Sequence, residues 1–114
     1  MMDSSAVYTP ALRVDLQHEP LPAEKIVCGN PGTAIHELGD LAGCGIGIWE
    51  MTPGTATDIE TEEVFVVLSG KARILFLDHG STLDIATGDV VRLREGQRTS
   101  WTVTETLRKI YFAA

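Results

Sequence analysis

An acidic pair at the start of an apolar strand is the strongest candidate for chemistry in these 114 residues. In the stretch "ETEEVFVVLSG", residues 60–70, Glu62 and Glu63 directly precede an apolar run. Successive strand residues point to opposite faces, so one acid turns inward with Phe65 while the other turns to water. A desolvated carboxylate needs a cation or a hydrogen-bond donor, or its pKa rises. We therefore predict that Glu63 lies in a pocket and Glu62 outside it.

A cation for Glu63 would come from the C-terminal third of the chain, where basic residues are concentrated. Alternation in the last predicted strand turns either Lys109 and Tyr111 or Arg108 toward the inside. The pattern alone does not choose among the possible partners. These are Arg92, Arg94, Arg98 and Lys109.

Two tryptophans are candidate ligand contacts. Trp49 and Trp101 each combine a large apolar surface with one polar handle, which suits a binding pocket. Each could instead fill the core or lie in a dimer interface. In the same way, Glu63 could hold the mouth of a pocket without doing chemistry. Glu50 follows Trp49 in the sequence, so the two side chains cannot both point into one cavity.

Short apolar runs separated by turn residues every 8 to 12 positions predict an all-β sandwich or barrel. "VLSGKARI" predicts a tight hairpin with Ser69 and Gly70 at its turn. Residues 33–43, "TAIHELGDLAG", are the only helix-tolerant stretch and are expected to be irregular or to form a single turn. Residues 1–22 are expected to form an extended arm that can add an edge strand, and residues 23–114 a single barrel domain.

The composition of the chain disfavours some classes of binding partner. Sixteen acidic and nine basic residues give a net charge of −7, which disfavours nucleic acid and anionic membranes. Cys28 and Cys44 form no metal-binding spacing, so we expect two free, buried thiols. No signal-peptide pattern is present, and no apolar run reaches the ~18 residues of a membrane helix. We expect a cytoplasmic protein.

Two segments resemble the two sequence motifs of the cupin superfamily. They are "PGTATDIETEEVFVVLSG" and "TGDVVRLREGQRTSWTV". Gly54, Glu63 and Gly70 stand at conserved positions of the first motif, and Gly88 with Gly96 at those of the second. "GIGIWEMTPG" and the terminal "RKIYF" are similar to the branch with ureidoglycine aminohydrolase-like and ethanolamine-utilisation cupins. The resemblance implies an RmlC-like cupin double-stranded β-helix, a jelly-roll barrel, with a largely unknown function.

The resemblance also implies which usual metal ligands are missing. Thr57 and Ile59 stand where cupins carry a histidine pair, Thr99 stands at the third histidine, and only Glu63 remains. Isoleucine cannot bind a metal and threonine is a poor ligand for transition ions, so no metal and no cofactor are expected. The family's "RK-x-Y" ending favours Lys109 inside, beside Glu63. The predicted catalytic residues are Glu63, Lys109 and Tyr111, and the predicted ligand-binding residues are Trp49, Phe65, Arg92, Thr99 and Trp101.

Three functions remain open. The first is a metal-free cupin that binds a small molecule, a zwitterion or a nitrogenous carboxylate, with or without catalysis. The second is a metal-dependent aminohydrolase acting on a ureido or amino carboxylate. The third is a non-catalytic dimeric interaction module. A homodimer is expected in every case, because an apolar outer face at Val64, Val66 and Leu68 needs a cover.

Overall fold

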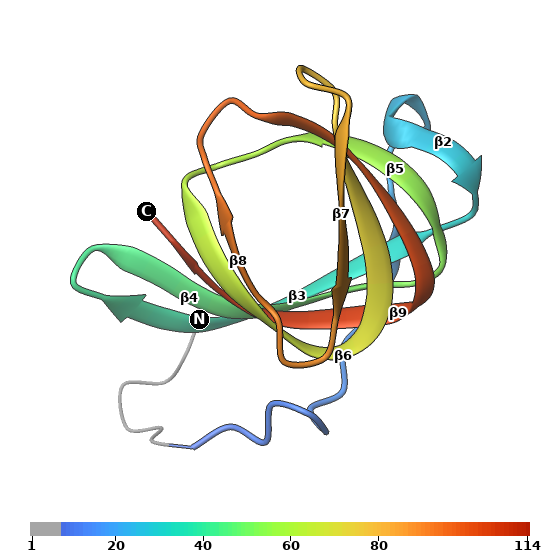
Figure 1. The fold of residues 1–114 in the computed structure, drawn as a ribbon. Helices are drawn as coiled ribbons and strands as arrows, with labels where there is room; N and C mark the ends of the chain where they lie inside the picture. The colour runs from blue at the N-terminus through green and yellow to red at the C-terminus, as the bar shows by residue number, and fades with distance from the viewer. Residues whose placement is uncertain (1–7) are drawn as a thin grey trace.

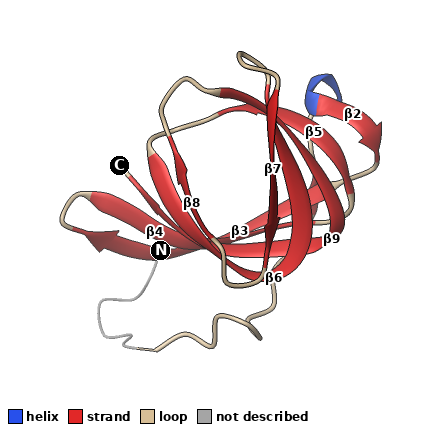
Figure 2. Cartoon of the chain, in the orientation of Figure 1, coloured by secondary structure: helices blue, strands red, loops and turns tan. Residues whose placement is uncertain are grey.

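The turn-separated apolar runs form strands, as expected. The computed structural model describes residues 8–114. Within them the only helix is one 3₁₀ turn, seen beside β2 in Figure 2. The elements are β1 (Glu19–Pro20), η1 (Ala23–Lys25), β2 (Ile26–Gly29), β3 (Gly32–Leu41), β4 (Cys44–Met51), β5 (Gly54–Ile59), β6 (Glu63–Phe76), β7 (Ser81–Ala86), β8 (Val90–Leu93) and β9 (Arg98–Ala113).

Two long strands, β6 and β9, organise the sheet. They pair with each other, and β9 also pairs with β5 through its first half and with β4 through its second half. Strand β6 pairs with β8 through its first half and with β7 through its second half. All strand pairs are antiparallel, and the sheet curls round a common axis into a barrel (Figure 1). The predicted all-β class is therefore confirmed.

The predicted hairpin at Ser69 and Gly70 is wrong. Strand β6 continues through both residues, and its register against β9 shifts between Val67 and Ala72. Gly70 has a φ of 96°, and a Cβ atom there would lie 2.1 Å from the carbonyl oxygen of Thr106. A positive-φ glycine serves a bulge as well as a turn. Here the bulge bends β6 so that one strand joins both halves of the barrel.

The helix-tolerant stretch is also a strand. Residues of β3 pair with β4 in a hairpin, and Ala34 and Leu38 are buried while His36 is exposed. Tertiary pairing overrides the weak local preference of this segment. On its other edge β3 pairs with β1, which gives the predicted arm its edge strand. Residues 1–7 of that arm lie outside the described part of the chain.

The N-terminal segment lies against the outside of β4 and β9. The guanidinium of Arg108 donates to the carbonyl oxygen of Ala11 at 2.9 Å and to Glu50 Oε1 at 2.8 Å. His18 Nε2 lies 2.7 Å from the other oxygen of Glu50. Arg108 is therefore the buried cation of the outer face, which resolves the alternative that alternation left open.

The core lies between the two halves of the curled sheet. Its fully buried members include Phe65, Ile74, Leu93 and Leu107, which come from β6, β8 and β9. Cys28 and Cys44 are free, as expected, but Cys28 is exposed and Cys44 only partly covered. Among residues 8–114, no helix has the length and hydropathy needed to traverse a bilayer.

Candidate functional site

A cavity of about 360 Å³ lies against β3, β4, β5 and β9. Its volume is at the lower end of the range for small-molecule sites. Apolar and aromatic walls surround a few charged groups, an arrangement typical of ligand pockets. The residues that matter most for its chemistry are Trp49, Glu60, Glu63, Trp101, Lys109 and Tyr111.

A buried ion pair occupies the cavity wall. The ammonium of Lys109 on β9 donates to Glu63 Oε2 on β6 at 2.8 Å, and the two side chains are 7% and 9% exposed. The register explains the meeting, because Glu63, Phe65 and Val67 pair with β9 residues of the same inward face as Lys109. Within residues 8–114, only the Oε2 atom of the Glu63 carboxylate accepts a hydrogen bond, and its Oε1 atom accepts none. The ammonium of Lys109 has two further N–H groups besides the one that it donates to Glu63.

Three aromatic rings surround the same ammonium. Lys109 Nζ lies 4.6 Å from the ring centroid of Trp49, 4.3 Å from that of Phe65 and 4.9 Å from that of Trp101. Each ring attracts a cation through its quadrupole, by about 0.5–2 kcal/mol. The rings also exclude water, which strengthens the attraction between Lys109 and Glu63. The ammonium is therefore held in position, and it lies in the wall of the cavity.

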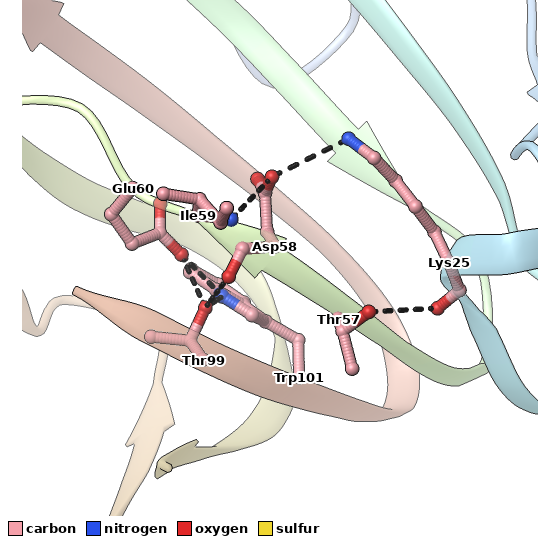
Figure 3. A network of polar contacts seen from close by, with 7 residues as sticks. All are labelled: Lys25, Thr57, Asp58, Ile59, Glu60, Thr99 and Trp101. Atoms are coloured by element: carbon pink, nitrogen blue, oxygen red, sulfur yellow. Dashed lines mark hydrogen bonds and ion pairs between the residues drawn. The ribbon is translucent and has the colours of Figure 1, made fainter. Parts of the chain in front are cut away.

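A second buried carboxyl group, Glu60, lies in the loop between β5 and β6. Its Oε2 atom accepts hydrogen bonds from Thr99 Oγ1 at 2.6 Å and from Trp101 Nε1 at 2.8 Å (Figure 3). Thr99 is fully buried and Trp101 is 5% exposed, so both donors are removed from bulk water. Thr99 therefore contributes to the cavity through Glu60 instead of lining it.

Burial raises the pKa of Glu60, and the hydrogen bonds from Thr99 and Trp101 only partly offset that rise. The negative charge of Asp58 raises the pKa of Glu60 further, while Lys109 lowers it. The two buried carboxyl groups of the cavity thus have different surroundings: Glu63 faces an ammonium directly, and Glu60 faces two neutral donors.

Tyr111 lies flat against the backbone of β4. It pairs in register with Gly47, where a Cβ atom would come within 2.3 Å of the phenol oxygen. Burial raises the pKa of Tyr111, and the charges of Glu37 and Glu63 raise it further. The phenol therefore stays neutral at physiological pH and offers a hydrogen-bond donor to the cavity.

The mouth of the cavity carries an exposed ion pair. Lys25 Nζ lies 3.5 Å from Asp58 Oδ1, and the carbonyl oxygen of Lys25 accepts a hydrogen bond from Thr57 (Figure 3). Cross-strand pairs place Ala56 and Asp58 on the inward face of β5, opposite Trp101 and Thr99. The inward positions are thus one residue away from those that the cupin motif had assigned to Thr57 and Ile59.

Arg92 was predicted to bind the ligand, but the structure places it outside the cavity. Its side chain is 45% exposed and binds Glu62 on the outside of the barrel, together with the carbonyl oxygens of Glu63 and Leu93. Glu62 therefore faces water, and Arg92 does not line the cavity. The other predicted residues are close together: Trp49, Glu63, Trp101, Lys109 and Tyr111 line the cavity, and Phe65 and Thr99 lie directly behind it.

Glu60 is the residue that sequence reasoning missed. It lies three positions before Glu63, so strand alternation places it on the other face, but the intervening loop turns both side chains inward. The available signal was on β9, where Thr99 and Trp101 are two apart and present hydrogen-bond donors on the same face. Buried donors require an acceptor.

The sequence of residues 38–111 matches the EutQ-like cupin domain family. The chain belongs to this family. Its barrel is accordingly a cupin barrel, as the sequence motifs implied. No curated protein gave a significant match.

Solved structures agree with the fold of this cupin. The EutQ protein of Clostridium difficile is 21% identical with a TM-score of 0.63, and the match covers 73% of this chain and 68% of that one. A protein of unknown function from Pseudomonas syringae is 24% identical with a TM-score of 0.74. That match covers 99% of this chain but 46% of the other, so the cupin spans about half of that protein's length.

A DUF861 family protein from Thermotoga maritima is 32% identical, with a TM-score of 0.56, and the match covers 59% of this chain and 76% of that one. Several structural neighbours of this cupin are described as proteins of unknown function.

The usual metal of cupins does not fit the residues of this cavity. The Oε2 atom of Glu63 is bound by an ammonium, and the hydroxyl of Thr99 is bonded to Glu60. Among residues 8–114, no group of three or more His, Cys, Asp or Glu side chains is arranged to hold a metal ion. The donor set of a transition-metal site is therefore not assembled here.

Proposed function

We propose that this cupin binds a small carboxylate or zwitterion in its cavity through the Glu63–Lys109 pair, without a histidine-bound metal. The observation that carries the proposal is the buried ammonium, held 2.8 Å from Glu63 and surrounded by three rings. Its two remaining N–H groups can bind the oxygens of a carboxylate. The free oxygen of Glu63 can accept from an ammonium of the same ligand.

The size and walls of the cavity support a small ligand. About 360 Å³ accommodates a compact metabolite, and the apolar surface of Trp49 and Trp101 can cover its carbon atoms. The phenol of Tyr111 offers one further donor.

Ligand-induced thermal shifts test this function. A panel of glycine, β-alanine, propionate and ureidoacetate is added to the wild type and to Glu63→Gln and Lys109→Met. We expect at least one compound to raise the melting temperature of the wild type and to lose that effect in Lys109→Met. The matched controls are Lys71→Met and Glu105→Gln, which change a similar pair of charges at 3.4 Å on the surface.

The outcomes separate the alternatives. Shifts that survive both cavity substitutions would contradict a role for the ion pair and favour a non-catalytic module with a vestigial cavity. Ammonia release from ureidoglycine that requires added manganese and is lost with a chelator would support the metal-dependent aminohydrolase instead. In that case elemental analysis would find about one ion per chain.

A further inference from the structure

Glu60 is a second buried carboxyl group of the cavity, and the proposed function does not use it. The residue is 6% exposed and lines the same cavity as Glu63 and Lys109. Other charged or titratable groups also face this cavity. They are Lys25 from η1, Asp58 from β5, Glu63 from β6, and Lys109 and Tyr111 from β9.

The hydrogen bonds of Glu60 show which oxygen can carry a proton. The indole N–H of Trp101 only donates, and it contacts both Glu60 Oε2 and, at 3.1 Å, Thr99 Oγ1. The hydroxyl of Thr99 accepts there and has two possible acceptors for its own hydrogen, Glu60 Oε2 at 2.6 Å and the carbonyl oxygen of Asp58 at 3.4 Å. The shorter contact favours Glu60 Oε2. While Trp101 and Thr99 both donate to Oε2, a proton bound by Glu60 is on Oε1.

The Oε1 atom of Glu60 is not fully buried. It makes no hydrogen bond to another residue within 8–114, yet no buried side-chain nitrogen or oxygen in that range lacks a partner. Oε1 is therefore not fully buried, and the cavity is the space that Glu60 lines. A proton on Oε1 makes Glu60 a donor toward a bound molecule, and its loss leaves a negative charge at the same point.

We propose that Glu60 is the pH-dependent specificity residue of the cavity: with a proton on Oε1 it donates to a ligand carboxylate that Lys109 also holds, and without it repels that carboxylate. This role rests on the proposed function. Burial, which raises the pKa of Glu60, keeps the proton in place at higher pH than on an exposed glutamate. A neutral carboxylic acid in an apolar site is an effective hydrogen-bond donor.

The first test needs no ligand. Carboxyl carbons of glutamate are labelled with ¹³C and followed by NMR during a pH titration of the wild type and of Glu60→Gln. We expect one resonance to titrate above the ordinary glutamate range and to be missing in Glu60→Gln. Thr99→Val removes a donor to the ionised form and should move that midpoint further up. A Glu60 resonance that titrates with the exposed glutamates would overturn the proposal.

The second test uses propionate as the probe, with binding measured by NMR above about pH 5.5, where propionate is ionised. We expect its affinity for the wild type to fall by about tenfold or more as pH rises through the Glu60 midpoint. Glu60→Gln imitates the protonated form, because its carbonyl can accept from Thr99 and Trp101 while its amide donates to the cavity. Its affinity should not change with pH.

The two proposals fail differently. Propionate that binds the wild type with the same affinity across the range would overturn the role of Glu60 and leave the carboxylate site standing. If propionate and the other three compounds of the thermal-shift panel bind neither protein at any pH, the carboxylate site itself is overturned, and with it this role of Glu60. The surface variant Glu105→Gln, which removes an exposed carboxylate, should behave as the wild type throughout.

Discussion

Glu63 and Lys109 depend on each other because both are nearly removed from water. Their side chains are 9% and 7% exposed, so each charge has lost most of its hydration. Under these conditions the pair itself adds little stability compared with apolar residues, but removing one partner is costly. The rings of Trp49, Phe65 and Trp101 stabilise the ammonium of Lys109. They do not stabilise the carboxylate of Glu63, so they cannot compensate its charge if Lys109 is removed.

Lys109→Met should therefore destabilise the protein by about 3–5 kcal/mol, since an uncompensated carboxylate is left behind. Urea unfolding followed by tryptophan fluorescence measures this loss. The double variant with Glu63→Gln should recover a large part of it, because a neutral amide costs less to bury. A double variant as unstable as the sum of the two single variants would contradict coupling within the pair.

Glu60 should make stability depend on pH. The pKa of Glu60 is raised in the folded state, so the folded protein holds this proton more tightly than the unfolded chain. Its contribution is fully present below the unfolded pKa and is lost as pH rises toward the folded one. The free energy of unfolding of Glu60→Gln should therefore improve relative to the wild type as pH rises through that window. A difference between the two proteins that is constant with pH would contradict this expectation.

At the scale of elements, the bulge in β6 lets one strand belong to both halves of the barrel. Glu63 and Phe65 lie before it and the strand then bends to pair with β7. Gly70 permits the bend for two reasons, its positive φ and its contact with the backbone of Thr106. Gly80 has a positive φ of 71° but nothing within 4 Å of an added Cβ atom, so it isolates the first reason.

Gly70→Ala should accordingly destabilise the protein more than Gly80→Ala. The backbone conformation alone costs an L residue roughly 1–2 kcal/mol, which is the expected loss for Gly80→Ala. Gly70→Ala adds an overlap with backbone that cannot move aside, and it should also weaken the binding of any cavity ligand. Thermal unfolding of both variants measures the difference. Equal losses would mean that the close approach to Thr106 is relaxed at little cost.

At the scale of the whole molecule, one outer face of the barrel remains apolar. Cross-strand pairs join Val64 to Phe112 and Val66 to Ile110, and β8 extends this face with Val90, which is 68% exposed. Branched and aromatic side chains gathered on one sheet face are typical of surfaces that associate. The homodimer predicted from the sequence would be formed through this face.

Val90→Glu should convert such a dimer to monomers without loss of the fold, because it introduces a charge into the apolar face at an exposed position. Sedimentation velocity at micromolar concentration measures the change, and circular dichroism checks the fold. Leu41→Glu is the matched control, since Leu41 is 67% exposed but lies at the tip of the β3–β4 hairpin. A wild type that sediments as a monomer would contradict the prediction.

The sequence by itself determined the strand pattern, the cupin motifs and the direction of one acidic pair. These features are local: alternation with a period of two separates Glu62 from Glu63, and turn residues separate the strands. Alternation also grouped Lys109 with Tyr111 without choosing this face over that of Arg108, and only the resemblance to the family's ending favoured it. Such local patterns were enough to predict the fold class, but they did not predict which side chains of the site contact each other.

Only the tertiary structure decided which charges meet. Lys109 instead of Arg92 lies against Glu63 because of the register between β6 and β9, and a one-residue change of register reverses every side chain. Glu60 turns inward because its loop breaks the alternation, and Gly70 forms a bulge although its sequence suits a turn equally well. Register, loop path and strand curvature arise from packing between distant segments, which no local pattern specifies.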